Sequence, residues 1–198
     1  SQNSIAEALT NLVWAPLDKG LKSVSLSANW MWPCKNPGED ARLYEAVKAA
    51  SDFAIELGIN IPTGKDSLSM KQKYPDKEVL SPGTVIISAG GHCQDISKVV
   101  EPVLQVNGDS LYYINFSQDK PKLGGSSLAQ TLNKIGQDAP CIKDADFFKK
   151  AFNAVQTLIS KDLIHAGHDI SAGGLITCLL EMCFADTNIG ADIDLKDF

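Results

Sequence analysis

The sequence predicts a mixed fold, with an α+β unit followed by an α/β unit. Segments whose apolar residues alternate, as in strands, are interleaved with segments whose apolar residues recur every three to four positions, as in helices. Glycine and proline separate most of these segments. The 198 residues are enough for two small domains. We expect domains at residues 1–93 and 109–198, joined by a linker at 94–108.

In the first domain, helical periodicity predicts helices at residues 4–14 and 41–57. Ser4 and Glu7 have the spacing of a capping box at the first helix, and Gly58 is suited to end the second. Between them, apolar side chains alternate with serine and asparagine, as in a half-buried strand. The segments expected in addition to the helices are a strand at 21–32, a loop at 33–40, an extended stretch at 59–62, a turn-rich connector at 74–83 and a buried strand at 84–89.

The second domain shows the same alternation of strand and helix patterns. A run of leucine, tyrosine, isoleucine and phenylalanine predicts a strand, and later segments have amphipathic helical spacing. The expected segments are a strand at 111–116, helices at 127–135, 146–163 and 175–185, and a strand at 191–195. Interleaved strands and helices indicate a layered α/β arrangement.

The composition excludes several classes of function. The 24 acidic residues outnumber the 18 basic ones, the net charge is −6, and lysine and arginine form no dense patch, so we expect no nucleic-acid partner. No apolar run approaches the roughly 18 residues of a membrane helix. The five cysteines are odd in number and contain no CxxC pair, which favours reduced thiols and a cytoplasmic protein.

The turn at residues 168–175 is the first candidate site. An aspartate (Asp169), a hydroxyl (Ser171) and two glycines (Gly173 and Gly174) precede an apolar helical run, where free backbone N–H groups can bind an anion. Magnesium binds one or two carboxylates and completes its shell with phosphate. Asp169 is therefore a candidate Mg²⁺ ligand. The same residues are also ordinary helix-capping residues, and the turn alone leaves that alternative open.

A second candidate is the pair Glu7 and Asn11 on the first helix. Residues four apart project from the same side of a helix, so a carboxylate and an amide oxygen could reach one hard cation. The alternative is that Glu7 completes the capping box and Asn11 is simply exposed.

The stretch from Gly64 to Met70 is a third candidate. Its Lys65, Asp66, Ser67 and Ser69 could bind phosphate or ribose, because lysine supplies a point charge and the serines and aspartate supply hydrogen bonds. The stretch lacks the spacing of a Walker loop. A strand with polar residues on its solvent face is the alternative.

Six stretches together match one known family. They are EALTN (7–11), LSANWM (26–31), PGEDA (37–41), GKDSLSM (64–70), LGGS (123–126) and HDISAGGL (168–175). The whole set resembles the phosphoribosylformylglycinamidine synthases of the large single-chain form, and more narrowly the second of their two aminoimidazole-ribonucleotide-synthetase-like halves. The match covers almost the whole chain in the right order.

The resemblance implies an N-terminal α+β domain that forms half of a shared barrel and a C-terminal α/β domain, both incomplete here. It implies a ligase of purine biosynthesis that uses ATP and glutamine-derived ammonia to convert formylglycinamide ribonucleotide into the amidine. By motif, Glu7, Asn11 and Asp169 correspond to magnesium ligands, and Ser171 lies at the ATP or ADP. Lys65 to Ser69 correspond to a loop facing a nucleotide or substrate phosphate across the barrel.

The resemblance also implies what lies elsewhere in the enzyme. A further aspartate ligand is expected upstream of Ser1, and the glutaminase domain and the first synthetase-like half are expected partners, with homodimerisation through the barrel as another. Ile170 and Ala172 depart from the more common HDRSDGGL, which puts a catalytic role for either in doubt. In large-form relatives this nucleotide site is auxiliary, so we expect an inactive fragment. The alternatives are a non-catalytic, nucleotide-stabilised scaffold and another member of the synthetase superfamily.

Overall fold

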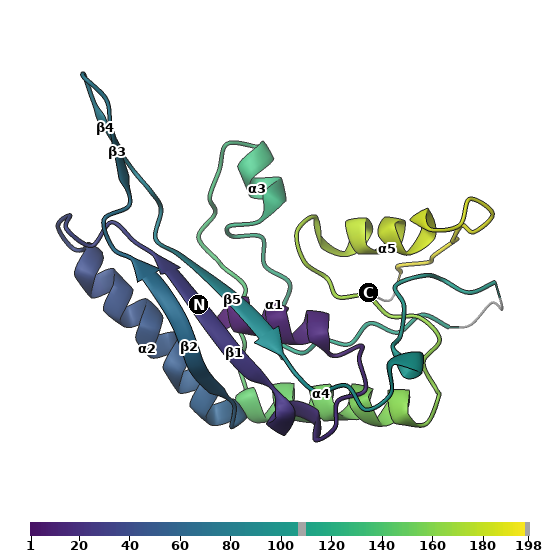
Figure 1. The fold of residues 1–198 in the computed structure, drawn as a ribbon. Helices are drawn as coiled ribbons and strands as arrows, with labels where there is room; N and C mark the ends of the chain where they lie inside the picture. Colours follow the sequence, from purple (N-terminus) through teal and green to yellow (C-terminus); the bar gives the residue numbers. More distant parts are fainter. Residues whose placement is uncertain (107–109, 197–198) are drawn as a thin grey trace.

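The computed structural model describes residues 1–106 and 110–196, in which helices pack on a small mixed sheet (Figure 1). Residues 107 and 108, at the end of the expected linker, lie outside the described residues. The elements are α1 (Gln2–Leu12), η1 (Gly20–Ser23), β1 (Ser25–Met31), α2 (Glu39–Leu57), β2 (Asn60–Ser67), β3 (Lys71–Lys73), β4 (Glu78–Leu80), β5 (Thr84–Gly90), η2 (Ile96–Lys98), α3 (Ser127–Thr131), α4 (Ala145–Ser160) and α5 (Gly174–Phe184).

The main sheet has the order β2-β1-β5, with β1 parallel to β2 and antiparallel to β5. In β1, Leu26 and Ala28 are buried and their neighbours are not, which confirms the half-buried strand that the alternation predicted. The strand expected at 84–89 is confirmed as β5, but the expectation that it is buried is wrong. Ile86 is 50% exposed because β5 forms an edge of the sheet and one of its faces is uncovered.

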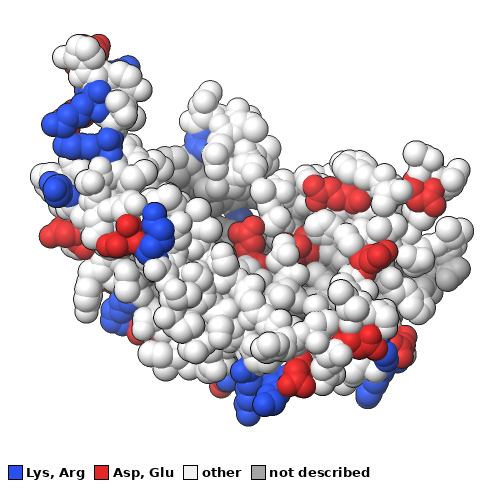
Figure 2. Space-filling model, in the orientation of Figure 1, with Lys and Arg blue, Asp and Glu red and all other residues white. Residues whose placement is uncertain are grey.

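The turn-rich connector expected at 74–83 folds in part as a hairpin. Strands β3 and β4 pair antiparallel, with Lys71 opposite Leu80, and they project away from the rest of the molecule (Figure 1). Figure 2 shows basic side chains gathered on this projection, which carries Lys71, Lys73 and Lys77. The sequence did not indicate this hairpin because each strand has only three residues.

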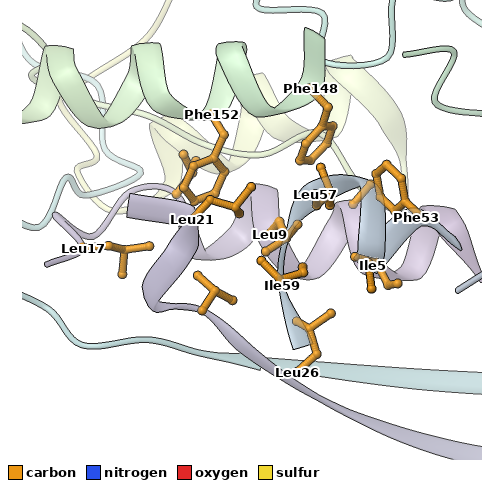
Figure 3. Close-up of a cluster of buried hydrophobic side chains, with 14 of the residues drawn as sticks. Ile5, Leu9, Leu17, Leu21, Leu26, Phe53, Leu57, Ile59, Phe148 and Phe152 are labelled. Carbon is orange, nitrogen blue, oxygen red and sulfur yellow. The ribbon is translucent and has the colours of Figure 1, made fainter. Parts of the chain in front are cut away.

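One hydrophobic core joins the two halves of the chain. Figure 3 shows Phe148 and Phe152 of α4 reaching into the same cluster as Ile5 and Leu9 of α1 and Leu57 of α2. All of these side chains are almost completely buried. Helix α4 is amphipathic as predicted, and the carboxylate of Asp144 caps its start by accepting a hydrogen bond from the Phe147 N–H.

The structure corrects the expected start of the first helix. Helix α1 begins at Gln2, with Ser1 as its N-cap residue, so Ser4 and Glu7 lie inside the helix and form no capping box. The end of α2 is as expected, because Gly58 takes a left-handed conformation (φ +74°) that suits glycine.

The strands expected at 111–116 and 191–195 are wrong. Both segments lie outside the strands of the described chain, and Tyr112 is 86% exposed. A strand is held by hydrogen bonds to a neighbouring strand. The sheets of the described residues contain no strand that pairs with either segment. The helix expected at 127–135 is shorter than predicted, and Ser126 caps it through the Ala129 N–H.

Between the halves, the segment at 94–106 contains the short helix η2 and buries Val100. The division into domains at 93 and 109 stays a prediction, and residue 109 is not described. None of the helices within residues 1–106 and 110–196 has the length and apolarity needed to cross a bilayer.

Candidate functional site

A pocket of about 870 Å³ lies where α1, β5, the segment after η2 and the turn at 167–169 meet. Glu7 and Asn11 of α1 and Asp169 of the turn all line it, although they come from opposite ends of the sequence. The remaining lining residues are mostly apolar: Ser4, Ala8, Leu12, Trp14, Ala15, Val85, Ile86, Ile87, Ser88, Ala89, Val99, Val100, Pro102, Gly167 and His168.

Helix α1 places Glu7 and Asn11 toward this pocket because its opposite face is in the core. Ile5 and Leu9 are completely buried, whereas Glu7 and Asn11 are exposed. Neither the Glu7 nor the Asn11 side chain forms a hydrogen bond or ion pair with another described residue. Their oxygens are therefore available to a ligand, and the capping alternative for Glu7 is removed.

The Asp169 carboxylate is held more tightly. Its side chain is only 10% exposed, and its Oδ1 lies 3.5 Å from Nδ1 of His168. The other ring nitrogen of His168 lies 3.2 Å from a carboxylate oxygen of Glu181 on α5. His168 therefore bridges the turn to α5, which restrains the backbone around Asp169.

The donor set fits a hard cation. Two carboxylates and an amide oxygen are the ligand types that Mg²⁺ takes, and no lysine or arginine is among the residues that line the pocket. Figure 2 shows acidic side chains in the hollowed centre of this face. In the described part of the chain, no three His, Cys, Asp or Glu side chains gather as a metal site by themselves. A cation here would take Asn11 and oxygens from water or phosphate as further ligands.

Ser171, Gly173 and Gly174 follow Asp169 at the start of α5, outside the set of residues that line the pocket. Both glycines have positive φ angles, +92° and +73°, which other residues rarely adopt. A Cβ at residue 173 would also lie 2.7 Å from Cβ of Thr177. The Gly174 N–H donates to the Ser171 carbonyl, so it is already engaged within the turn.

Lys65 to Ser69 are not among the residues that line this pocket. Lys65 and Ser67 are on β2, separated from β5 by β1, and the Lys65 ammonium lies 3.3 Å from the Ser67 hydroxyl. Asp66 is paired with Trp30 in the strand register, and Ser69 follows the strand. Within one chain, the structure thus separates these residues from the pocket that holds Asp169. Their role in binding a nucleotide or substrate stays a prediction.

Three pocket residues escaped the sequence analysis. The sequence predicts Ser4 as a cap and Trp14 as the end of a helix, and Gly167 lies just before the predicted turn at 168–175. Trp14 has its indole Nε1 buried without a partner among the described residues. All three line the same pocket, and Gly167 packs closely against Trp14, which no local sequence pattern indicates.

Two family models match the chain, one after the other. Residues 1–92 match the FGAR-AT PurM N-like domain, and residues 106–198 match the C-terminal domain of AIR synthase related proteins. The chain therefore contains a PurM N-like domain followed by a C-terminal domain of the AIR synthase-related class, and the predicted mixed fold is confirmed.

Similarity to individual proteins gives a more specific assignment than the two domain models. The chain is 46% identical over 97% of its length to a probable phosphoribosylformylglycinamidine synthase of Arabidopsis thaliana, described as chloroplastic/mitochondrial, and spans 14% of that protein. It is 45% identical to the probable enzyme of Caenorhabditis elegans, over 97% of the chain and 15% of the relative. It is 41% identical to the Homo sapiens phosphoribosylformylglycinamidine synthase, over 97% of the chain and 14% of the relative. The chain is homologous to a small part, 14–15% of the length, of these phosphoribosylformylglycinamidine synthases, which confirms the resemblance.

Proposed function

We propose that Glu7, Asn11 and Asp169 hold a magnesium ion together with the phosphates of ATP or ADP. The observation that carries this proposal is that the three side chains line one pocket and that two of them have no other described partner. Oxygen ligands with free lone pairs at the edge of an open pocket suit a partly hydrated Mg²⁺ that also binds phosphate. The ion would offset the negative charge of the phosphates at this place.

On this proposal, the chain contributes this site to a ligase of purine biosynthesis that depends on ATP and glutamine. That ligase converts formylglycinamide ribonucleotide to formylglycinamidine ribonucleotide. The similarity to phosphoribosylformylglycinamidine synthases over 97% of the chain supports this. The nucleotide site is auxiliary, so the chain alone has no synthase activity. The first synthetase-like half and the glutaminase domain are its partners. A cytoplasmic location stays a prediction.

A second function is a scaffold that pairs with another synthetase-like domain. The uncovered face and the free edge of β5 favour it, because an edge strand presents unpaired N–H and C=O groups. The two functions are separated by replacing Lys65 or Asp66 in the complete enzyme. Loss of turnover with the fold intact favours the ligase role of this part, whereas loss of stability alone favours the scaffold.

Calorimetric titration of the chain with ADP and MgCl₂ tests the magnesium site. We expect saturable binding that requires Mg²⁺ and is lost in Asp169→Ala. Asp52→Ala is the matched control, because Asp52 is exposed, lies within α2 outside the lining of the pocket and pairs with Lys48 on the same helix. Equal affinities for the original chain and Asp169→Ala would remove Asp169 from the site.

A further inference from the structure

The turn that carries Asp169 makes one close contact with Trp14, two residues after the end of α1. Gly167 is buried, and a Cβ at this position would lie 2.6 Å from Cη2 of the Trp14 ring and closer still to Cζ3 and Cε3. Carbon atoms in contact lie about 3.5–4.0 Å apart, so no side chain fits between the backbone and the ring. The φ angle of Gly167 is not in the positive region, so glycine is needed here for space and not for its backbone conformation.

Backbone hydrogen bonds connect three segments around this contact. The Val100 N–H donates to the Trp14 carbonyl at 3.0 Å, and the Gly167 N–H donates to the Glu101 carbonyl at 3.2 Å. The segment after η2 thus lies between the end of α1 and the turn, and binds both. Three segments that are far apart in the sequence therefore meet at this contact.

The segment just after α1 is also held by hydrogen bonds from α4. The side-chain amide of Gln156 on α4 donates to the carbonyls of Val13 and Ala15, on either side of Trp14, at 2.6 and 2.9 Å, and its oxygen accepts from the Leu17 N–H at 2.8 Å. These bonds hold the backbone on both sides of Trp14, so a side chain added at residue 167 should displace the turn and not the Trp14 backbone.

From this geometry we infer that Gly167 and Trp14 are positioning residues, whose close packing sets the Asp169 carboxylate beside Glu7 and Asn11. This rests on the proposed magnesium site for its role in binding, although the positioning itself concerns the turn alone. Asp169 is only two residues from Gly167, so a turn pushed off the ring by a side chain carries the carboxylate away from α1.

A four-protein comparison tests the inference: the original chain, Gly167→Ala, Trp14→Leu and the double variant, with Gly190→Ala as control because a Cβ there meets no atom within 4 Å. The first measurement is binding of Mn²⁺, as MnCl₂ with ADP, followed by electron paramagnetic resonance. We expect Gly167→Ala to lose roughly 10- to 100-fold in Mn²⁺ affinity, as for other residues that orient metal ligands. The double variant should recover most of the loss, because the smaller side chain makes room. A double variant as weak as Gly167→Ala would overturn the inference.

The second measurement needs no metal. Cys178 on α5 is 5% exposed, and burial, followed by the nearby charge of Asp169, raises the pKa of its thiol. Moving the turn should increase maleimide labelling of Cys178 in Gly167→Ala and reverse the increase in the double variant, with the exposed Cys93 as reference thiol. Unchanged labelling in Gly167→Ala contradicts the positioning role. Changed labelling without Mn²⁺ binding in the original chain supports the positioning role and refutes the magnesium site alone.

Discussion

The rings of Phe148 on α4 and Phe53 on α2 pack edge to face, with their centroids 5.8 Å apart and their planes at 77°. Phe116 also packs against Phe148, with the ring centroids 5.2 Å apart. The two family models place Phe53 and Phe148 in different domains, yet the side chains share one core. The pocket depends on this core, because it holds α1 and the second half of the chain together.

Replacing Phe148 with alanine should therefore destabilise the whole chain. The side chain is completely buried, so we expect the free energy of unfolding to fall by about 3–5 kcal/mol. Urea denaturation followed by circular dichroism and by tryptophan fluorescence measures it. Phe184→Ala is the matched control, since Phe184 is 71% exposed and its loss should change stability little. Two separate transitions, with only one affected, would show that the halves do not share a core.

Gly64 allows β2 to lie against β1. A Cβ at residue 64 would lie 3.1 Å from the carbonyl carbon of Ala28 and closer to its oxygen, which is backbone and cannot rotate away. Gly64→Ala should lower the free energy of unfolding by about 1–3 kcal/mol, the usual cost of overpacking. The control is Gly90→Ala in the same sheet, where a Cβ meets nothing within 4 Å. Thermal unfolding of both variants provides the comparison, and equal melting temperatures would contradict the prediction.

Asp119 should make stability depend on pH in the acid range. Its carboxylate accepts hydrogen bonds from the Lys122 ammonium at 2.6 Å and the Cys141 thiol at 3.2 Å, which lower its pKa from 3.8 to about 2. A lowered pKa in the folded state adds stability above the pKa of the unfolded state. That contribution is lost as the pH falls from about 4 to about 2.

The measurement is urea denaturation at several pH values between 2 and 5, for the original chain and for Asp119→Asn. The variant should be less stable at pH 5 and should show a shallower loss of stability on acidification. Parallel pH profiles for the two proteins would mean that the Asp119 carboxylate does not contribute.

Helices and the central strand were predictable from the sequence because their periodicity is local. The strands at 111–116 and 191–195 failed because a strand pattern fixes which residues suit a strand but not whether a partner strand is available. The capping box at Ser4 failed because a serine and a glutamate at the right spacing are also compatible with a helix that starts a turn earlier.

For the candidate site, the residue types and the four-residue spacing of Glu7 and Asn11 determined by themselves that their oxygens lie on one side of a helix, and that Asp169 precedes another. Only the tertiary structure decided that these oxygens line one pocket, because this depends on the Trp14 ring, the Gly167 backbone and the intervening segment at Val100 and Glu101. Such packing is set by the shapes of distant residues, whereas sequence patterns report only on neighbours along the chain. The same limit explains why the sequence alone did not show that β2, which carries Lys65 to Ser67, lies at the opposite edge of the sheet from β5.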